Sequence, residues 1–247
     1  MDKEIRAPYF KIESFGAVDG PGIRLVLFLQ GCPYRCLYCH NPESWKINGS
    51  KTFITPTELI ERYRHNESYY RNSGGITLSG GEPLIHMDFC LEVCRLGYEN
   101  NISIALDTSG ATFNSTNLNF YKKIIKYKPL WLVDIKHINP KKHKGLCGVE
   151  NQNEINLIKF LEKNKQHYWI RQVLLPGYTD DPKDLEKLGK FLKTLKYNDK
   201  FELQPYHTMG VQKYNQLKVK YRIVNVPEPS KDEILDAIQI ITSNIKK

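Results

Sequence analysis

Six short apolar segments alternate along this chain with segments of amphipathic helical pattern, and this alternation limits the fold more than any other feature. Each apolar segment has the length of a buried strand and is followed by a loop. The predicted strands cover residues 23–30, 76–78, 102–107, 130–136, 168–175 and 201–206. The predicted helices cover residues 57–65, 88–99, 117–127, 151–163, 182–196 and 231–243.

Strands and helices that alternate at this spacing indicate parallel strands joined by right-handed crossovers. The pattern predicts an α/β fold, either an open doubly wound sheet or a partial (β/α) barrel. The first helix has the firmest start signal, because Thr55-Pro56-Thr57-Glu58 combines a capping box with a proline at the first helical position. In both folds, ligands bind at the carboxyl ends of the strands.

The length of 247 residues and the hydrophobic fraction of 40 % suit one α/β domain that spans residues 1–247. The longest unbroken apolar run, residues 25–29, is too short to cross a bilayer, and residues 1–10 lack the pattern of a secretion signal. The six cysteines therefore indicate a reducing compartment rather than a disulfide framework. We expect a soluble, cytoplasmic protein with no membrane partner.

The chain carries a net charge of +9, from 36 basic and 27 acidic residues. Charge alone permits a module that binds nucleic acid. The lysines are spread over helical segments, as in Lys122-Lys123 and Lys141-Lys142, rather than gathered in one arm. Solvated helix faces explain this distribution better, and we expect no nucleic-acid partner.

Polar residues lie within or directly after each predicted strand. In chain order these are a cysteine loop, Ser79-Gly80-Gly81-Glu82-Pro83, Asp107-Thr108-Ser109-Gly110, Asp134 with Lys136, Arg171, and His207. Because the carboxyl ends of parallel strands meet at one edge, the sequence predicts that these residues share one rim.

The cysteine loop places Cys32, Cys36 and Cys39 within eight positions. Three thiolates can hold three irons of a cubane cluster and leave the fourth iron open, whereas a structural zinc site needs four ligands. His40 could complete such a zinc site, so zinc is the alternative. Cys90 and Cys94 lie four apart on a helical pattern and are expected to be buried hydrophobic residues, and Cys147 has no assigned role.

The spacing CxxxCxxC of residues 32–39, together with Gly80-Gly81-Glu82-Pro83, resembles the motifs of the radical S-adenosylmethionine superfamily. Further segments are similar to the activating enzymes of glycyl radical enzymes, and most of all to the pyruvate formate-lyase activating family. These segments are VDGPGIR (18–24), CLYCHNP (36–42), LDTSG (106–110), VDIK (133–136), WIR (169–171), LPGY (175–178) and QPYH (204–207). One departure is Leu217-Lys218, where that family commonly has Leu-Gly.

The resemblance implies the radical S-adenosylmethionine fold, a partial (β/α)₆ barrel of parallel strands, in a monomer. It implies a 4Fe–4S cluster with one open iron, held by Cys32, Cys36 and Cys39, and S-adenosyl-L-methionine bound to that iron. The expected reaction forms a 5′-deoxyadenosyl radical that abstracts a hydrogen atom from a glycine of pyruvate formate-lyase. The alternative is activation of a different glycyl radical enzyme. The expected electron donor is flavodoxin or ferredoxin.

The resemblance also assigns roles to individual residues. Residues expected at S-adenosylmethionine are Tyr38, Asn41, Gly80, Gly81, Glu82, Lys136, Arg171 and His207. Asp19 is expected to bind the glycyl loop of the partner, and His40 to lie just beyond the cluster. A sodium or potassium ion is expected at Asp107, Thr108, Asp134 and the backbone of Leu132.

Overall fold

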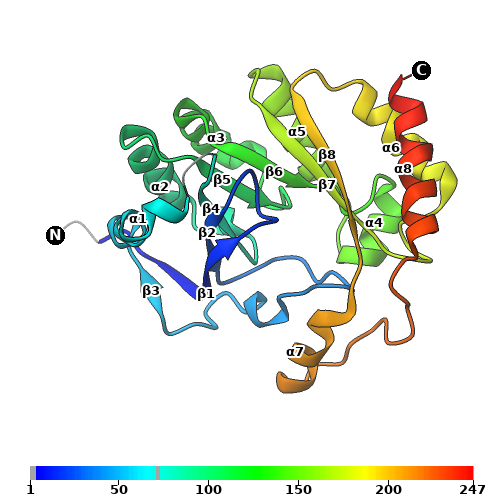
Figure 1. Cartoon of the computed structure of the whole chain (residues 1–247), viewed down its shortest axis with the longest axis horizontal. Helices are drawn as coiled ribbons and strands as arrows, with labels where there is room; N and C mark the ends of the chain where they lie inside the picture. The colour runs from blue at the N-terminus through cyan, green and yellow to red at the C-terminus, as the bar shows by residue number, and fades with distance from the viewer. Residues whose placement is uncertain (1–3, 71–72, 247) are drawn as a thin grey trace. The chain divides into compact units, whose positions relative to one another are not determined.

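The computed structural model describes residues 4–70 and 73–246 (Figure 1). The strands of these residues are β1 (Ala7–Gly16), β2 (Arg24–Leu29), β3 (Phe53–Ile54), β4 (Gly75–Gly80), β5 (Ile104–Thr108), β6 (Leu130–Asp134), β7 (Tyr168–Leu174) and β8 (Asn198–Pro205). Their α-helices are α1 (Pro56–His65), α2 (Met87–Glu99), α3 (Leu118–Ile124), α4 (Pro140–Cys147), α5 (Gln152–Lys163), α6 (Pro182–Lys193), α7 (Val211–Gln216) and α8 (Lys231–Lys246).

Hydrogen bonding orders the strands β3-β1-β2-β4-β5-β6-β7-β8, an open series with β3 and β8 at its ends. The pairs β2–β4, β4–β5 and β7–β8 are parallel, whereas β1 is antiparallel to both β2 and β3. The six predicted strands correspond to β2 and to β4 through β8. The predicted α/β fold, a sheet of mostly parallel strands that does not close, is confirmed.

The first helix begins at Pro56, one residue before the predicted start. Its capping box is present: the backbone N–H of Glu58 donates to Thr55 Oγ1 at 3.2 Å, and the backbone N–H of Thr55 donates to Glu58 Oε2 at 2.8 Å. These two bonds satisfy backbone donors that the first turn of a helix leaves unpaired. None of the helices in the described residues is long and apolar enough to span a membrane.

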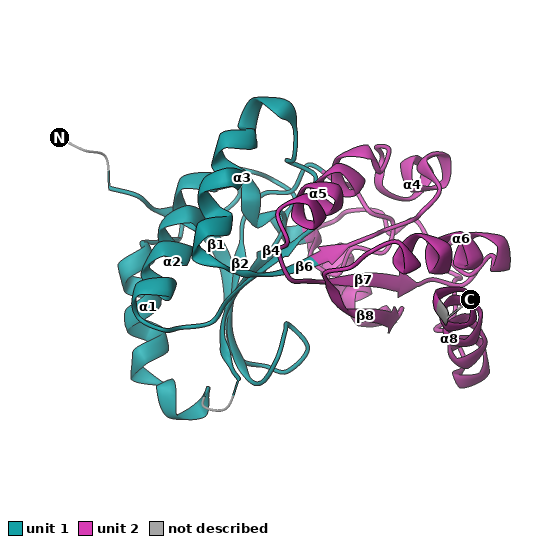
Figure 2. Cartoon of the chain, turned by 90° about the horizontal axis from the view of Figure 1, so that it is seen from above, with its two compact units in different colours: residues 1–33, 43–132 teal, residues 34–42, 133–247 magenta. Residues whose placement is uncertain are grey.

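Contacts within the chain divide it into two compact units, drawn in separate colours in Figure 2. The first unit comprises residues 1–33 and 43–132, and the second comprises residues 34–42 and 133–247. In the first unit, α1 packs on α2 and α2 on α3, and the sheet buries apolar residues such as Leu27 and Leu78. In the second unit, α6 packs on α8, and Leu188 and Ile241 are buried. The single domain over residues 1–247 stays a prediction.

Candidate active site

The glycine turn that follows β4 packs backbone against backbone in the first unit. The N–H of Gly81 donates to the carbonyl oxygen of Leu29 at 2.9 Å, and the N–H of Glu82 donates to that of Gly31 at 2.8 Å. A Cβ on Gly81 would overlap the Gly31 carbonyl group, and Gly80 adopts a φ of 113° that favours glycine. Only glycine at position 81 lets the turn lie this close to the segment that leads into Cys32.

The carboxylate of Glu82 is fully buried and joins the ends of β4 and β5. It accepts hydrogen bonds from Thr108 Oγ1 at 2.6 Å, Ser109 Oγ at 2.6 Å, and the backbone N–H groups of Ser109 at 2.9 Å and Leu84 at 3.2 Å. Burial raises the pKa of Glu82, and these four donors oppose that rise. The side chain therefore fixes the two strand ends to each other. Sequence reasoning did not identify Ser109 as its partner.

A second link between these strand ends joins Ser79 to Asp107. Ser79 Oγ donates to Asp107 Oδ2 at 2.7 Å. Asp107 is only half-buried, whereas the next residue, Thr108, is fully buried, and so is Leu132. In the first unit, the structure thus brings together the residues that follow β4 with those that end β5.

The Asp19-Gly20-Pro21-Gly22 loop is attached to the sheet by a buried arginine. Arg24 donates to Thr77 Oγ1 at 2.7 Å, to the carbonyl oxygens of Ile76 and Ser103 at 2.9 Å each, and to that of Pro21 at 3.2 Å. Thr77 Oγ1 in turn donates to the carbonyl oxygen of Asp19 at 2.7 Å.

Burial lowers the pKa of Arg24 to about 10, which leaves its guanidinium charged at neutral pH. Arg24 and Thr77 are the residues that position the predicted substrate-binding loop, and sequence reasoning assigned neither of them a role.

In the second unit, Asp134 lies between two cations. Lys136 Nζ is 2.5 Å from Asp134 Oδ2, and Arg171 Nε is 3.2 Å from Asp134 Oδ1. Burial acts to raise the pKa of Asp134, but the charges of Lys136 and Arg171 outweigh it and hold that pKa below its ordinary value. Burial likewise acts to lower the pKa of Lys136, and Asp134 reverses this and raises it well above its ordinary value. The cluster thus presents two cationic side chains, Lys136 and Arg171, beside one carboxylate.

The segment 34–42, which carries Cys36 and Cys39, is held by α4 and α7. The N–H groups of Arg35 and Leu37 donate to the carbonyl oxygens of Cys147 at 3.1 Å and Leu146 at 3.0 Å. Tyr214 donates its hydroxyl to the carbonyl oxygen of Cys39 at 2.9 Å. Further along, Lys213 Nζ donates to Asn41 Oδ1 at 3.0 Å.

Cys36 is the buried cysteine of the motif, whereas Cys32 and Cys39 are partly exposed. The Sγ atoms of Cys36 and Cys147 are 3.4 Å apart. Hydrogen bonding with Cys147 lowers the pKa of the Cys36 thiol, and the same contact with burial raises that of Cys147. Tyr38 is also buried, and burial raises the pKa of its hydroxyl well above the ordinary value. Cys147, without a role in the sequence prediction, is thus a neighbour of a predicted cluster ligand.

His40 and His207 stack with ring centroids 3.9 Å apart and an interplanar angle of 29°. His40 Nε2 is 3.0 Å from the carbonyl oxygen of His207, so the nitrogen is the donor. Burial and the neighbouring His207 lower the pKa of His40 to about 4. His40 is therefore neutral at physiological pH, and the stack fixes the orientation of the predicted cofactor-binding His207.

Comparison with known proteins decides the family of this chain. Residues 18–155 match the sequence model of the family described as "4Fe-4S single cluster domain". The pyruvate formate-lyase-activating enzyme of Staphylococcus epidermidis is 40 % identical over 238 residues, which are 95 % of this chain and 95 % of that protein. The chain belongs to the pyruvate formate-lyase-activating enzyme family.

Solved structures agree with this family and with the fold. A crystal structure of a domain of pyruvate-formate lyase-activating enzyme from Bacteroides vulgatus aligns with 70 % of this chain and 95 % of that domain, at 25 % identity and a TM-score of 0.57. A radical SAM methyltransferase from Sphaerobacter thermophilus aligns with 90 % of this chain and 64 % of that chain, at 16 % identity and a TM-score of 0.64. The latter likeness is one of fold alone.

The motif cysteines of this member of the pyruvate formate-lyase-activating enzyme family have the chemistry that an iron–sulfur cluster requires. Cys32, Cys36 and Cys39 are not joined in disulfides, and thiolates are the usual ligands of such clusters. Cys32 belongs to the first unit and the other two to the second. Over residues 4–70 and 73–246, the structure holds no preassembled group of three or more His, Cys, Asp or Glu side chains that could hold a metal ion.

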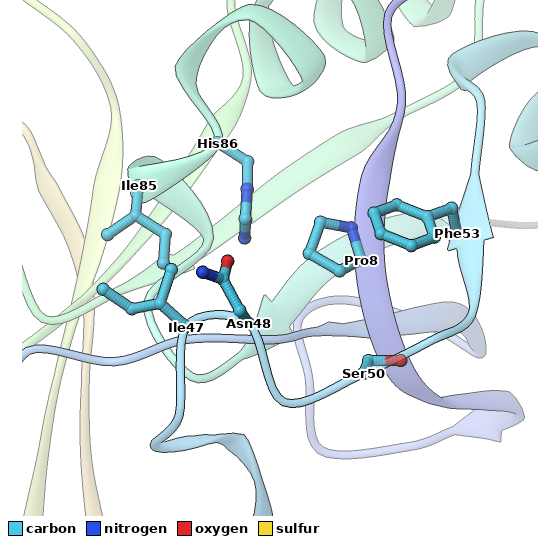
Figure 3. A pocket seen from close by; sticks show the side chains of 7 residues that line it. All are labelled: Pro8, Ile47, Asn48, Ser50, Phe53, Ile85 and His86. Atoms are coloured by element: carbon cyan, nitrogen blue, oxygen red, sulfur yellow. The ribbon is translucent and has the colours of Figure 1, made fainter.

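A cavity of about 600 Å³ lies in the first unit (Figure 3). Its lining residues are Pro8, Ile47, Asn48, Ser50, Phe53, Ile85 and His86. None of these is a predicted site residue. The residues that the family motifs share therefore lie outside this cavity.

Proposed function

We propose that this chain activates pyruvate formate-lyase by installing a radical on one of its glycine residues. The observation that carries the proposal is the 40 % identity to an activating enzyme of that name over 95 % of both chains. The glycine turn at residues 80–82, packed on the backbone that enters Cys32, supports it, because the two family motifs are then joined directly. When bound, the 4Fe–4S cluster supplies the electron that cleaves S-adenosylmethionine to methionine and a 5′-deoxyadenosyl radical.

The protein's part in this proposal is to hold the cluster, orient the cofactor and admit the glycine. Cys32, Cys36 and Cys39 would hold three irons and leave one for S-adenosylmethionine. Gly80 and Gly81 would offer close backbone approach to its methionine part. Because the carboxylate of Glu82 is enclosed by donors from the end of β5, we assign it the positioning of this turn rather than direct contact.

Charge supports the assignment of residues in the second unit. Lys136 and Arg171 both bring a charged donor to this cluster, and ammonium and guanidinium groups suit the carboxylate of the methionine part. Neutral His40 stacks on His207 and would hold it toward the adenosyl part. Tyr38 and Asn41 would complete this side, with Asn41 oriented by Lys213.

Asp19 would contact the glycyl loop of the partner, on a loop that Arg24 and Thr77 attach to the sheet. The proposed sodium or potassium ligands are Asp107, Thr108, Asp134 and the carbonyl oxygen of Leu132. Oxygen donors suit such a hard cation. Asp134 would have to share its charge with Lys136 and Arg171. A flavodoxin or ferredoxin would supply the electron, and we propose a monomeric, cytoplasmic enzyme.

Production of 5′-deoxyadenosine tests the first half of the reaction. The anaerobically reconstituted protein, reduced with dithionite, should convert S-adenosylmethionine to 5′-deoxyadenosine and methionine. Cys39→Ala should abolish the product. Cys94→Ala removes a buried thiol of α2 and should still form 5′-deoxyadenosine, so this variant controls for the loss of a cysteine. A colourless reconstituted protein that binds zinc tightly would contradict the proposal.

A further inference from the structure

Cys36 and Cys147 form a pair of thiols that the proposed reaction does not use as a pair. Their Sγ atoms are 3.4 Å apart, and the two residues are 8 % and 1 % exposed. They come from segments 111 residues apart in sequence, both within the second unit. The sequence prediction left Cys147 without a role.

The backbone around the two thiols is fixed on both sides. The N–H groups of Arg35 and Leu37, which flank Cys36, donate to the carbonyl oxygens of Cys147 and Leu146. Helix α4 ends at Cys147. Gly148 caps it with a φ of 92°, and the N–H of Gly148 donates a hydrogen bond to the carbonyl oxygen of Lys144. The two cysteines therefore meet because their main chains are held together, so their proximity does not depend on the side chains alone.

This geometry is close to that of a disulfide. A disulfide has an S–S distance of about 2.0 Å, so the Sγ atoms must approach by about 1.4 Å to form one. The other motif thiols, Cys32 and Cys39, are more exposed than Cys36. Cys147 thus places its thiol directly beside the buried cysteine of the motif.

We propose that Cys36 and Cys147 form a reversible disulfide when the chain without its cluster meets hydrogen peroxide. The thiolate of Cys36 attacks the peroxide O–O bond, which yields a sulfenic acid and hydroxide. The thiol of Cys147 then attacks the sulfenic sulfur, the S–S bond forms, and water leaves. Two thiols and one peroxide give one disulfide and two water molecules, and an external thiol reverses the reaction by exchange.

The disulfide has a consequence for the cluster ligand. A sulfenic acid that meets no thiol is oxidised further to sulfinic and sulfonic acids, which external thiols do not reverse. Capture by Cys147 keeps Cys36 recoverable. This consequence rests on the proposed role of Cys36 as a cluster ligand, whereas formation of the disulfide does not.

The test uses the full chain, reduced and freed of metal, and treated with one equivalent of hydrogen peroxide. Remaining thiols are alkylated, and a tryptic digest is analysed by mass spectrometry. Residues 36–46 carry Cys36 and Cys39, and residues 145–159 carry Cys147. Most chains should contain a link between these two peptides, with two hydrogens lost, Cys39 alkylated, and full reversal by dithiothreitol.

Two variants complete the test. Cys147→Ser should lose the link completely at this dose, with unchanged circular dichroism, and should accumulate sulfinic acid at Cys36 when a second equivalent of hydrogen peroxide is added. Cys94→Ser should keep the link. An unlinked wild-type chain, or Cys36 joined to Cys39 or Cys32, would overturn the proposal. Because the assay contains no iron and no S-adenosylmethionine, a failure here is distinct from a failure of the proposed function.

Discussion

Replacement of Gly81 by alanine adds a methyl group where the glycine turn meets the segment before Cys32. The new Cβ would lie 2.6 Å from the carbonyl carbon of Gly31 and closer still to its oxygen, and 3.2 Å from Cys32 Cβ. Ordinary contact begins near 3.4 Å, so the Gly31 carbonyl carbon must recede by about 0.8 Å and its oxygen by more. The obstacle is backbone, which cannot yield by rotation of a side chain.

The cost follows from two effects. Forced overpacking of a well-packed site costs about 1–3 kcal/mol. Displacement of Gly31 also breaks the bond from the N–H of Glu82 to its carbonyl oxygen, which contributes about 1 kcal/mol. We expect Gly81→Ala to lower the free energy of unfolding by about 2–4 kcal/mol. Because the displaced backbone leads directly into Cys32, the iron content after reconstitution should fall as well.

Gly145→Ala is the matched control. Gly145 lies within α4, and a Cβ there has no atom within 4 Å. Alanine in a helix interior is more favourable than glycine by about 0.5–1 kcal/mol. Urea denaturation and iron analysis of both variants measure the two effects. A Gly81→Ala protein as stable as wild type, with full iron content, would refute this account of the turn.

Three further predictions follow from the polar contacts. Arg24→Met should lower the free energy of unfolding by about 2–4 kcal/mol in urea denaturation, because it leaves buried acceptors unpaired, and a loss below about 0.5 kcal/mol would count against that role. The lowered pKa of Asp134 contributes stability that is present above the ordinary carboxyl pKa and is lost as pH falls through the folded value. The difference in the free energy of unfolding between wild type and Asp134→Asn, measured by denaturation between pH 7 and 3, should therefore become smaller at the acid end. A difference that stays constant would contradict this prediction. Asp107→Ala should weaken S-adenosylmethionine binding and remove its dependence on potassium or sodium in equilibrium titrations, and unchanged affinity in cation-free buffer would disprove the cation assignment.

Much of the fold could be predicted because strand ends and helix starts are local signals. Apolar runs predict the six strands β2 and β4 through β8, and the spacing of Thr55 and Glu58 predicts the start of α1. Strand β1 was not predicted, because Lys11 and Glu13 interrupt its apolar pattern. Helices α4 and α7 were not predicted either, since short helices carry too few residues to display a period.

Partners distant in sequence could not be predicted from residue type. From its residue type alone, Arg24 is expected at the surface. Its buried hydrogen-bond acceptors become visible only when the register of β2 and β4 is known. Cys147 likewise has no neighbour in sequence that indicates its contact with Cys36.

One departure from the family pattern acquires a physical meaning in the structure. Lys218 stands where the family commonly has glycine, and it adopts a φ of 54°. This left-handed conformation costs a side-chain-bearing residue roughly 1 kcal/mol. Lys218 thus has a backbone conformation that glycine adopts without this cost.

The most direct test of the proposed function is electron paramagnetic resonance of pyruvate formate-lyase after activation. The reconstituted chain, S-adenosylmethionine and a reductant are mixed anaerobically with pyruvate formate-lyase from the same cell, and the spectrum is recorded. The account predicts the doublet of a glycyl radical, absent when Cys39→Ala replaces the wild-type chain. Formation of 5′-deoxyadenosine without any glycyl signal on pyruvate formate-lyase would contradict it.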